Sequence, residues 1–159
     1  MTSAESAFNQ LQQKAARFCA WRERCSSEVE EKLRQLGASA AQQKKLIQWL
    51  QQEGYLNDAR FARSFARGKF ANNHWGRIRI AMELKARHIE NTTIEEALIE
   101  ISENQYLQTM EKICNRKWEE LEGKENFERK QKTAAYLAGK GYELNLVWQI
   151  VEKIASQNR

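Results

Sequence analysis

The sequence contains no proline, and only 7 of its 159 residues are glycine. Proline and glycine supply many of the tight turns between short strands. Their scarcity therefore disfavours a β-sandwich or barrel and excludes a collagen-like or proline-rich chain. Hydrophobic residues make up 42% of the sequence and charged residues 30%, as in an ordinary globular protein. The composition predicts a helical folded chain.

Long apolar runs are also missing. No segment approaches the roughly 18 apolar residues that a membrane-spanning helix needs. Residues 1–10 lack the basic start and apolar block of an export signal. We therefore expect a soluble, cytoplasmic protein that does not contact a membrane.

Residues that carry chemistry are few. The sequence has no glycine-rich phosphate loop, no G-x-S-x-G motif, no carboxylate cluster that suggests a metal centre and no C-x-x-C pair. An odd number of cysteines indicates free, buried thiols, and the two histidines are expected to be structural or exposed. We therefore predict that the protein is not an enzyme and has no catalytic residue, cofactor or metal. The residues concerned are Cys19, Cys25, Cys114, His74 and His88.

What the sequence does contain is a threefold repeat. Shifts of 51 and then 53 residues place Leu33, Leu84 and Leu137 in one column. The same shifts align three further apolar columns, spaced i, i+1 and i+4 as on one face of an α-helix. These columns are Leu46, Ala97 and Ile150; Ile47, Leu98 and Val151; and Leu50, Ile101 and Ile154.

The repeat predicts an all-α protein of three tandem three-helix repeats, stacked into an elongated, curved molecule. We expect an N-terminal extension at 1–14, a first repeat at 15–55, a basic second repeat at 56–104 and a third repeat at 105–159. An elongated surface of this kind suits an elongated partner.

The ends of several helices can also be predicted. Ser26 or Ser27 is expected to cap the second helix, and Ser27 forms a capping-box pattern with Glu30. Asp58, with Asn57 beside it, is expected to cap the fourth helix. Gly37 and Gly141 stand where a helix ends in a left-handed residue. His88 takes the same place in the second repeat, with more strain.

Two boundaries in the second half of the chain follow from similar signals. Thr92 or Thr93 is expected to cap a helix that extends past Ile101. The glycine and the acidic residues of 119–127 predict a loop inside the third repeat.

The net charge of +5 is concentrated in the middle of the chain. Residues 58–88 hold eight basic side chains and two acidic ones, and the rest of the chain is close to neutral. Such a concentration favours an anionic partner. The eight candidate partner-binding residues are Arg60, Arg63, Arg67, Lys69, Arg77, Arg79, Lys85 and Arg87.

Three features of this basic segment allow two interpretations each. The stripe of Arg60, Arg63 and Arg67 is either a solvated helix face or, because no acid lies between its members, a binding surface for an anion. Ile78 and Met82 either pack against a neighbouring repeat or form an exposed apolar strip between cations. Trp75 is either a core residue or a platform for base stacking.

Two motifs in this region resemble a known family. Residues 54–61 read GYLNDARF, and residues 75–89 read WGRIRIAMELKARHI. Together they are similar to the central signature of the RecX family, bacterial regulators of the RecA recombinase. The resemblance extends over residues 15–154 and includes the threefold helical repeat. The family pattern has proline where Arg77 stands and glycine where His88 stands.

The resemblance implies a function. A RecX-type protein is expected to bind the RecA filament on single-stranded DNA and to modulate, mainly inhibit, its recombinase and coprotease activities in DNA repair and the SOS response. We expect a monomer that binds DNA directly only weakly.

The alternative is a direct DNA-binding protein of the helix-turn-helix type, since three short helices per repeat also describe that class. The acidic third helix of the second repeat (Glu95, Glu96 and Glu100) disfavours it. Lys44 and Lys45 keep it open in the first repeat.

Overall fold

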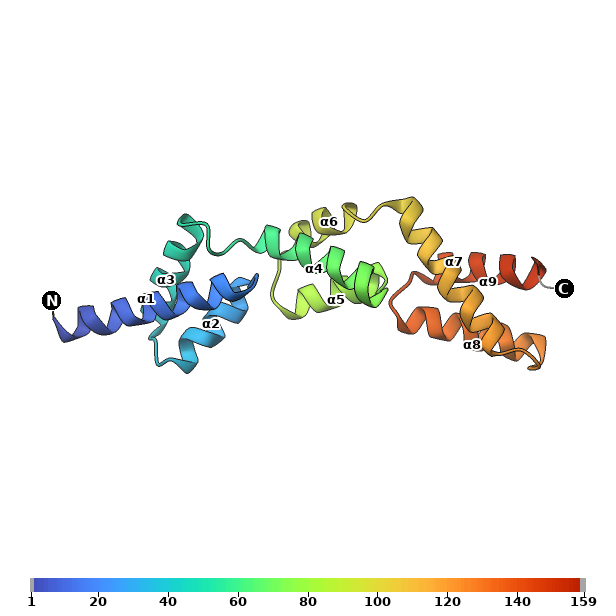
Figure 1. Cartoon of the computed structure of the whole chain (residues 1–159), viewed down its shortest axis with the longest axis horizontal. Coiled ribbons are helices and arrows are strands. Elements are labelled where there is room, and N and C mark those ends of the chain that lie inside the picture. Colours follow the sequence, from blue (N-terminus) through green and yellow to red (C-terminus); the bar gives the residue numbers. More distant parts are fainter. Residues whose placement is uncertain (1, 158–159) are drawn as a thin grey trace. The chain divides into compact units, whose positions relative to one another are not determined.

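The computed structural model describes residues 2–157, which form nine α-helices and no strand (Figure 1). They follow one another in three groups of three, so the predicted all-α fold of three-helix repeats is confirmed. The helices are α1 (Ser3–Trp21), α2 (Ser26–Gln35), α3 (Ala40–Gln52), α4 (Asp58–Asn73), α5 (Arg77–Ala86), α6 (Asn91–Ile99), α7 (Glu103–Glu120), α8 (Asn126–Gly139) and α9 (Leu144–Gln157).

The chain packs into two compact units. The first contains the described residues up to Ser64 together with Leu84–Ile94, and the second contains Phe65–Glu83 together with the described residues from Glu95 onward. The helices α4, α5 and α6 thus contribute residues to both units. The predicted repeat boundaries at residues 15, 56 and 105 stay a prediction.

The first unit is built on the mutual packing of α1, α2 and α3. Their apolar faces form one core, because each helix presents buried side chains at intervals of three or four residues. The N-terminal residues 3–14 belong to this packing: α1 runs through residue 14 without a break, and Phe8 and Leu11 pack against the core. A capping box between Thr2 and Glu5 starts α1 early, a signal that the sequence interpretation overlooked. The buried core residues are Ala15, Cys19, Val29, Leu33, Ala38, Leu46, Leu50 and Leu56.

The columns of the repeat occupy equivalent places in the structure. Leu33, Leu84 and Leu137 are each fully buried. Every residue in the other three columns is buried or half-buried. The second unit uses its columns where α7, α8 and α9 pack on one another. The columns therefore mark buried or half-buried positions in, or just after, the second and third helices of each group.

The start of α2 differs from the prediction. Ser27 and Glu30 form no capping box, and the N-cap residue Cys25 makes no side-chain cap hydrogen bond. Instead, Asp58 caps this helix from 32 residues away, because its Oδ1 accepts from the Ser26 N–H (2.8 Å) and the Ser26 Oγ (3.1 Å). Ser27 Oγ donates to the carbonyl oxygen of Arg87 (2.8 Å). The predicted capping box is wrong because it considered only neighbours in sequence.

The cap of α4 is also reassigned. Asn57 Oδ1 accepts from the Arg60 N–H (3.0 Å), so Asn57 caps α4 while Asp58 stabilises α2. The two side chains cap different helices, so each substitution removes a different capping hydrogen bond. We expect Asp58→Ala and Asn57→Ala each to lower the free energy of unfolding by about 1 kcal/mol, and the double variant by about 2 kcal/mol.

Urea denaturation of the three variants measures this. Asn72→Ala is the control, because Asn72 is exposed inside α4 and caps nothing. A double variant no less stable than Asp58→Ala alone would contradict the reassignment.

Helix C-termini follow the glycine prediction. Gly37 and Gly141 both have a left-handed backbone, with φ of +87° and +99°. His88 adopts φ of +60° at the equivalent place after α5, as predicted. A side chain in this conformation is strained because its Cβ approaches the following carbonyl oxygen.

His88→Gly should therefore raise the free energy of unfolding by about 1 kcal/mol. His88→Ala is the matched control, because it removes the imidazole and keeps the Cβ. Chemical denaturation should show a gain for glycine alone. An equal gain for both variants would assign the effect to the imidazole ring.

The predicted start and end of α6 are wrong, whereas the predicted loop between α7 and α8 is present. The helix α6 begins at Asn91 and ends at Ile99, so neither Thr92 nor Thr93 is its cap, and it does not reach past Ile101. Ser102 then caps α7 by accepting from the Gln105 N–H. The acidic loop lies between α7 and α8, within the predicted segment, although both helices extend into that segment.

Candidate functional site

The basic residues of α4 do not form the isolated stripe that the sequence suggested. Arg60 Nε donates to both carboxylate oxygens of Glu23 (2.9 and 2.7 Å), and its Nη2 donates to the carbonyl oxygen of Gly54 (3.2 Å). The hydrogen bond that Arg60 donates to the Glu23 carboxylate raises the pKa of Arg60 above its usual value. Arg60 thus joins the α1–α2 connection to the start of α4.

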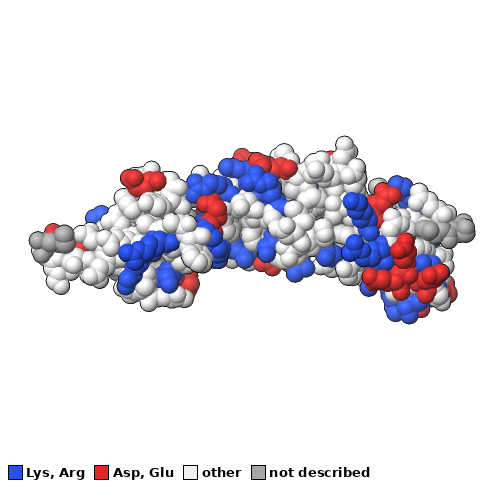
Figure 2. Space-filling model, viewed as in Figure 1, with Lys and Arg blue, Asp and Glu red and all other residues white. Residues whose placement is uncertain are grey.

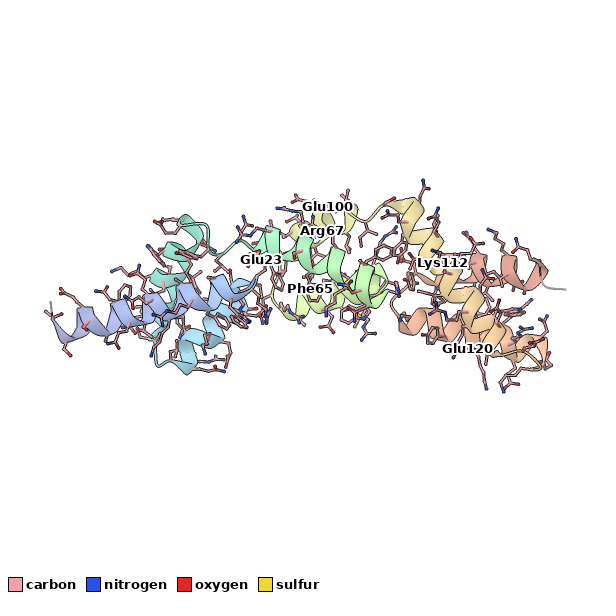
Figure 3. All side chains as sticks on the ribbon, in the orientation of Figure 1. Glu23, Phe65, Arg67, Glu100, Lys112 and Glu120 are labelled. Carbon is pink, nitrogen blue, oxygen red and sulfur yellow. The ribbon has the colours of Figure 1, made fainter. Side chains whose placement is uncertain are left out.

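In the second unit, Arg67 has an acidic neighbour of its own. Its Nη1 lies 3.0 Å from Oε2 of Glu100, which follows α6, and Figure 3 shows the two side chains together. Acidic and basic side chains adjoin on this part of the surface in Figure 2. The interpretation that the stripe lacks acidic partners is therefore wrong, because the partners of Arg60 and Arg67 come from the connections next to other helices. Arg63 is half-buried on α4.

Arg77 is held even more firmly. As the first residue of α5, it donates its backbone N–H to the Tyr106 hydroxyl (3.0 Å), a bond that proline could not make. Its guanidinium stacks on the Tyr106 ring (3.8 Å) and forms ion pairs with Glu143 (2.8 Å) and Glu103. Tyr106 in turn donates to Glu143. The departure from the family pattern at Arg77 therefore adds bonds within the second unit.

Close backbone packing fixes the same region. The Gly76 N–H donates to the Lys140 carbonyl (2.8 Å), and the Ile78 N–H donates to the Gly141 carbonyl (3.0 Å). Tyr142 donates its hydroxyl to the His74 carbonyl (2.7 Å). The start of α5 is thus attached to the turn between α8 and α9.

Trp75 lies between two cations and beside a phenyl ring. The Arg79 guanidinium stacks 4.1 Å from its ring centroid, and Lys69 Nζ lies at 4.9 Å. Phe65 meets the indole edge-on, with 6.2 Å between ring centroids. The tryptophan is half-buried in this cluster. Trp75 is therefore neither a fully buried core residue nor an open platform for base stacking. Its ring packs against Phe65 and supports the side chains of Arg79 and Lys69.

The solvent-facing side of α5 carries the clearest candidate surface. Ile78 is 46% exposed and Met82 is 65% exposed, whereas Ile80 on the opposite side is fully buried. Helical spacing places Arg79 and Lys85 on either side of this pair, and both are exposed. Of the two interpretations, the exposed apolar strip between cations is thus the observed one. Such a strip suits the surface of a protein partner.

The eight predicted residues therefore differ in availability. Arg60, Arg67 and Arg77 hold carboxylates of the same chain. Lys69 and Arg79 contact Trp75, and Arg87 is half-buried with its carbonyl engaged by Ser27. Arg79 and Lys85 lie on the exposed side of α5. The partner residues Glu23, Tyr106 and Glu143 were missed, since nothing in their local sequence marks them.

The thiols and imidazoles offer little chemistry. All three cysteines are free and buried, as predicted. Burial raises the pKa of Cys19 and Cys25, and it raises the pKa of Cys114 to about 12, so the thiolate nucleophile is disfavoured. His74 and His88 are exposed at helix ends, which is consistent with the prediction. Within residues 2–157, each helix is too short or too polar to cross a bilayer.

Comparison with known proteins identifies the family. A family model described as the second three-helix domain of RecX matches residues 57–98, and one described as the third three-helix domain of RecX matches residues 103–151. A Pseudomonas putida protein named "Regulatory protein RecX" is 30% identical over 141 residues, which cover 89% of this chain and 88% of that one. The chain belongs to the RecX family of regulatory proteins.

Other relatives carry the same name. A Salmonella typhimurium protein is 26% identical, with 97% of both chains covered. A Clostridium acetobutylicum protein is 24% identical, and the match covers 82% of this chain but 62% of that longer protein. The crystal structure of RecX from Lactobacillus salivarius matches with a TM-score of 0.87 at 19% identity, covering 94% of this chain and 97% of that one. The fold is therefore that of the RecX structures.

Proposed function

We propose that this protein binds the RecA filament on single-stranded DNA and modulates, mainly inhibits, its recombinase and coprotease activities. Membership of the RecX family carries the proposal. The proposed role is that of a cytoplasmic binding protein without catalytic activity or a cofactor, acting in DNA repair and the SOS response.

The exposed side of α5 supports a protein partner. It combines Ile78 and Met82 with the flanking cations Arg79 and Lys85. A DNA backbone would gain from the cations but would leave the two apolar side chains uncovered. An acidic protein surface with an apolar patch can satisfy both, so we propose α5 as the principal contact.

The basic residues that hold carboxylates are proposed to act differently. Arg60, Arg67 and Arg77 stabilise the positions of α4 and α5, and thereby present the α5 surface. Reversing the charges of Arg60, Arg63 and Arg67 together would therefore break two ion pairs within the chain as well as change the surface. That triple variant is unsuitable as a test of binding.

The rival function, direct DNA binding by helix-turn-helix units, draws support from the three-helix repeats and from the exposed Lys44 and Lys45 on α3. The exposed acids Glu95 and Glu96 on α6 oppose it in the second repeat, because they repel a phosphate groove.

An activity assay distinguishes the two functions. Purified protein should inhibit RecA-promoted strand exchange and RecA-stimulated repressor cleavage when filaments are assembled first. If inhibition requires adding the protein before RecA, and weakens when free DNA is added, the protein competes with RecA for DNA. The rival function would then be correct.

A further inference from the structure

A groove of about 340 Å³ opens along α1 and the end of α2 in the first unit. Four of the residues that line it are cations, and no lining residue is acidic. Its α1 members are spaced i, i+3, i+4 and i+7, which places them on one face of the helix. The groove is lined by Lys14, Arg17, Phe18, Trp21, Arg24, Lys32 and Leu36.

Trp21 is the most exposed of the large apolar side chains in the described chain, at 83%. The core-facing side of α1 is occupied by Ala15 and Cys19, so Trp21 takes no part in that core. A solvated indole leaves a large apolar area without a partner. The groove therefore offers apolar surface together with positive charge.

The cations in the groove crowd one another. The Arg24 guanidinium covers one face of Phe18 at 3.8 Å, and Lys32 Nζ lies 5.6 Å from the same ring. Burial and the neighbouring Arg22 lower the pKa of Arg24. The carboxylate of Glu28 lies 4.0 Å from Arg24 and is shared with Arg22 at 3.2 Å. An anionic segment that enters the groove would relieve this repulsion.

The same chain contains a segment of opposite character. Residues 119–128, at the end of α7 and the start of α8, hold five glutamates and one lysine. Phe127 in this segment is 67% exposed. No ion pair within residues 2–157 engages Glu119 or Glu122. Figure 2 shows acidic side chains gathered over the end of α7, where Figure 3 labels Glu120.

We propose that the α1–α2 groove of one molecule binds the α7–α8 segment of a second copy of this chain. Phe127 would contact the indole of Trp21, and the carboxylates of Glu119 and Glu122 would meet Lys14 and Arg17. The carboxylates of Glu119 and Glu122, which form no ion pair within residues 2–157, complement the cations of the groove. Because the two surfaces differ, the contact is head-to-tail and can add molecules one after another.

A nucleic acid fits the groove less well. Cations already lie over Phe18, so the ring is not free to stack on a base. The cations also surround a compact apolar pocket, whereas a strand of phosphates needs a line of charges. Self-association of this kind would replace the monomer expected from the sequence. It uses surfaces other than α5, so it does not depend on the proposed binding to RecA.

Sedimentation of the full chain over a concentration series tests the proposal. At low ionic strength, the weight-average mass should rise above 18.6 kDa, and salt near 0.5 M should weaken association at least about tenfold. Arg17→Glu in the groove, or Glu122→Lys in the segment, should each weaken it at least about tenfold. The matched controls Lys44→Glu and Glu96→Lys make equal charge changes at exposed sites elsewhere and should associate normally.

Mixing the two variants gives the decisive result. The Arg17→Glu protein keeps an intact segment, and the Glu122→Lys protein keeps an intact groove, so together they should form a one-to-one heterodimer that does not grow further. Two variants that stay monomeric in the mixture would overturn the proposal, as would a wild-type mass that is constant with concentration. Loss of oligo-dT binding by Arg17→Glu without any change in wild-type mass would show that the groove binds phosphate and would also overturn it.

Discussion

Combining Arg79→Glu with Lys85→Glu is expected to weaken binding to the RecA filament by about 100-fold, which corresponds to about 2.7 kcal/mol. The two cations flank Ile78 and Met82 on the exposed side of α5. Reversing both places like charges against an acidic partner and lowers the rate of encounter as well as the affinity. Fluorescence anisotropy with labelled, preassembled filament measures the affinity.

Stability and charge must be separated from the binding effect. Both residues are exposed and neither forms an ion pair within residues 2–157, so the double variant loses only the stacking of Arg79 on Trp75. Its helix content should equal that of the wild type, and its melting temperature should fall only slightly. Lys112→Glu combined with Arg116→Glu, two exposed sites on α7, is the matched control and makes the same change in net charge. An equal loss of affinity in both double variants would mean that only total charge matters, and α5 would then not be the contact.

The largest expected loss of stability comes from adding a single methyl group at Gly76. A Cβ there would overlap the backbone of Gly141 and come within 2.5 Å of the Tyr142 nitrogen. The start of α5 and the α8–α9 turn would have to separate, which weakens the hydrogen bonds that join them. We expect Gly76→Ala to lower the free energy of unfolding by about 3 kcal/mol.

Gly68→Ala provides the control, because Gly68 lies inside α4 with open space around its Cβ position. Alanine favours the helix there and should stabilise the protein by up to about 1 kcal/mol. Urea denaturation of both variants should therefore give effects of opposite sign. A Gly76→Ala variant as stable as the wild type would show that the close approach of the two backbones is not required.

The sequence predicted those parts of the structure that depend on neighbours along the chain. Apolar columns at fixed spacing specify the buried face of each helix, whatever that face contacts, so the columns that begin with Leu33 and Leu46 located the core. Gly37 and Gly141 were equally informative because a left-handed backbone is a local property.

The errors concern partners that are distant in sequence. Asp58 caps a helix that begins 32 residues earlier, and Glu23 neutralises an arginine 37 residues later. A helical wheel contains one helix only, so it showed Arg60 and Arg67 without their carboxylates. Only the folded chain shows which cations form ion pairs with carboxylates of the same chain and which, like Arg79 and Lys85, lie exposed on α5. This difference defines the candidate surface.

The proposed target is a filament and not bare DNA. Arg60, Arg67 and Arg77 already form ion pairs with carboxylates of the same chain, and residues 90–128 contain eleven acids against four bases. A strand of phosphates must avoid those acids, whereas a protein surface can meet them with its own cations. Binding to the filament should therefore depend on salt only modestly, with fewer effective ion contacts than eight.

Titration of the protein against preassembled filament and against bare single-stranded DNA, over the same salt series, is the most direct test. We predict tighter binding to the filament at physiological salt and a shallower slope of log affinity against log salt, while weak binding to bare DNA follows the steeper counterion-release law. Equal affinities with equal slopes would show that the protein recognises phosphate alone, and would contradict the account.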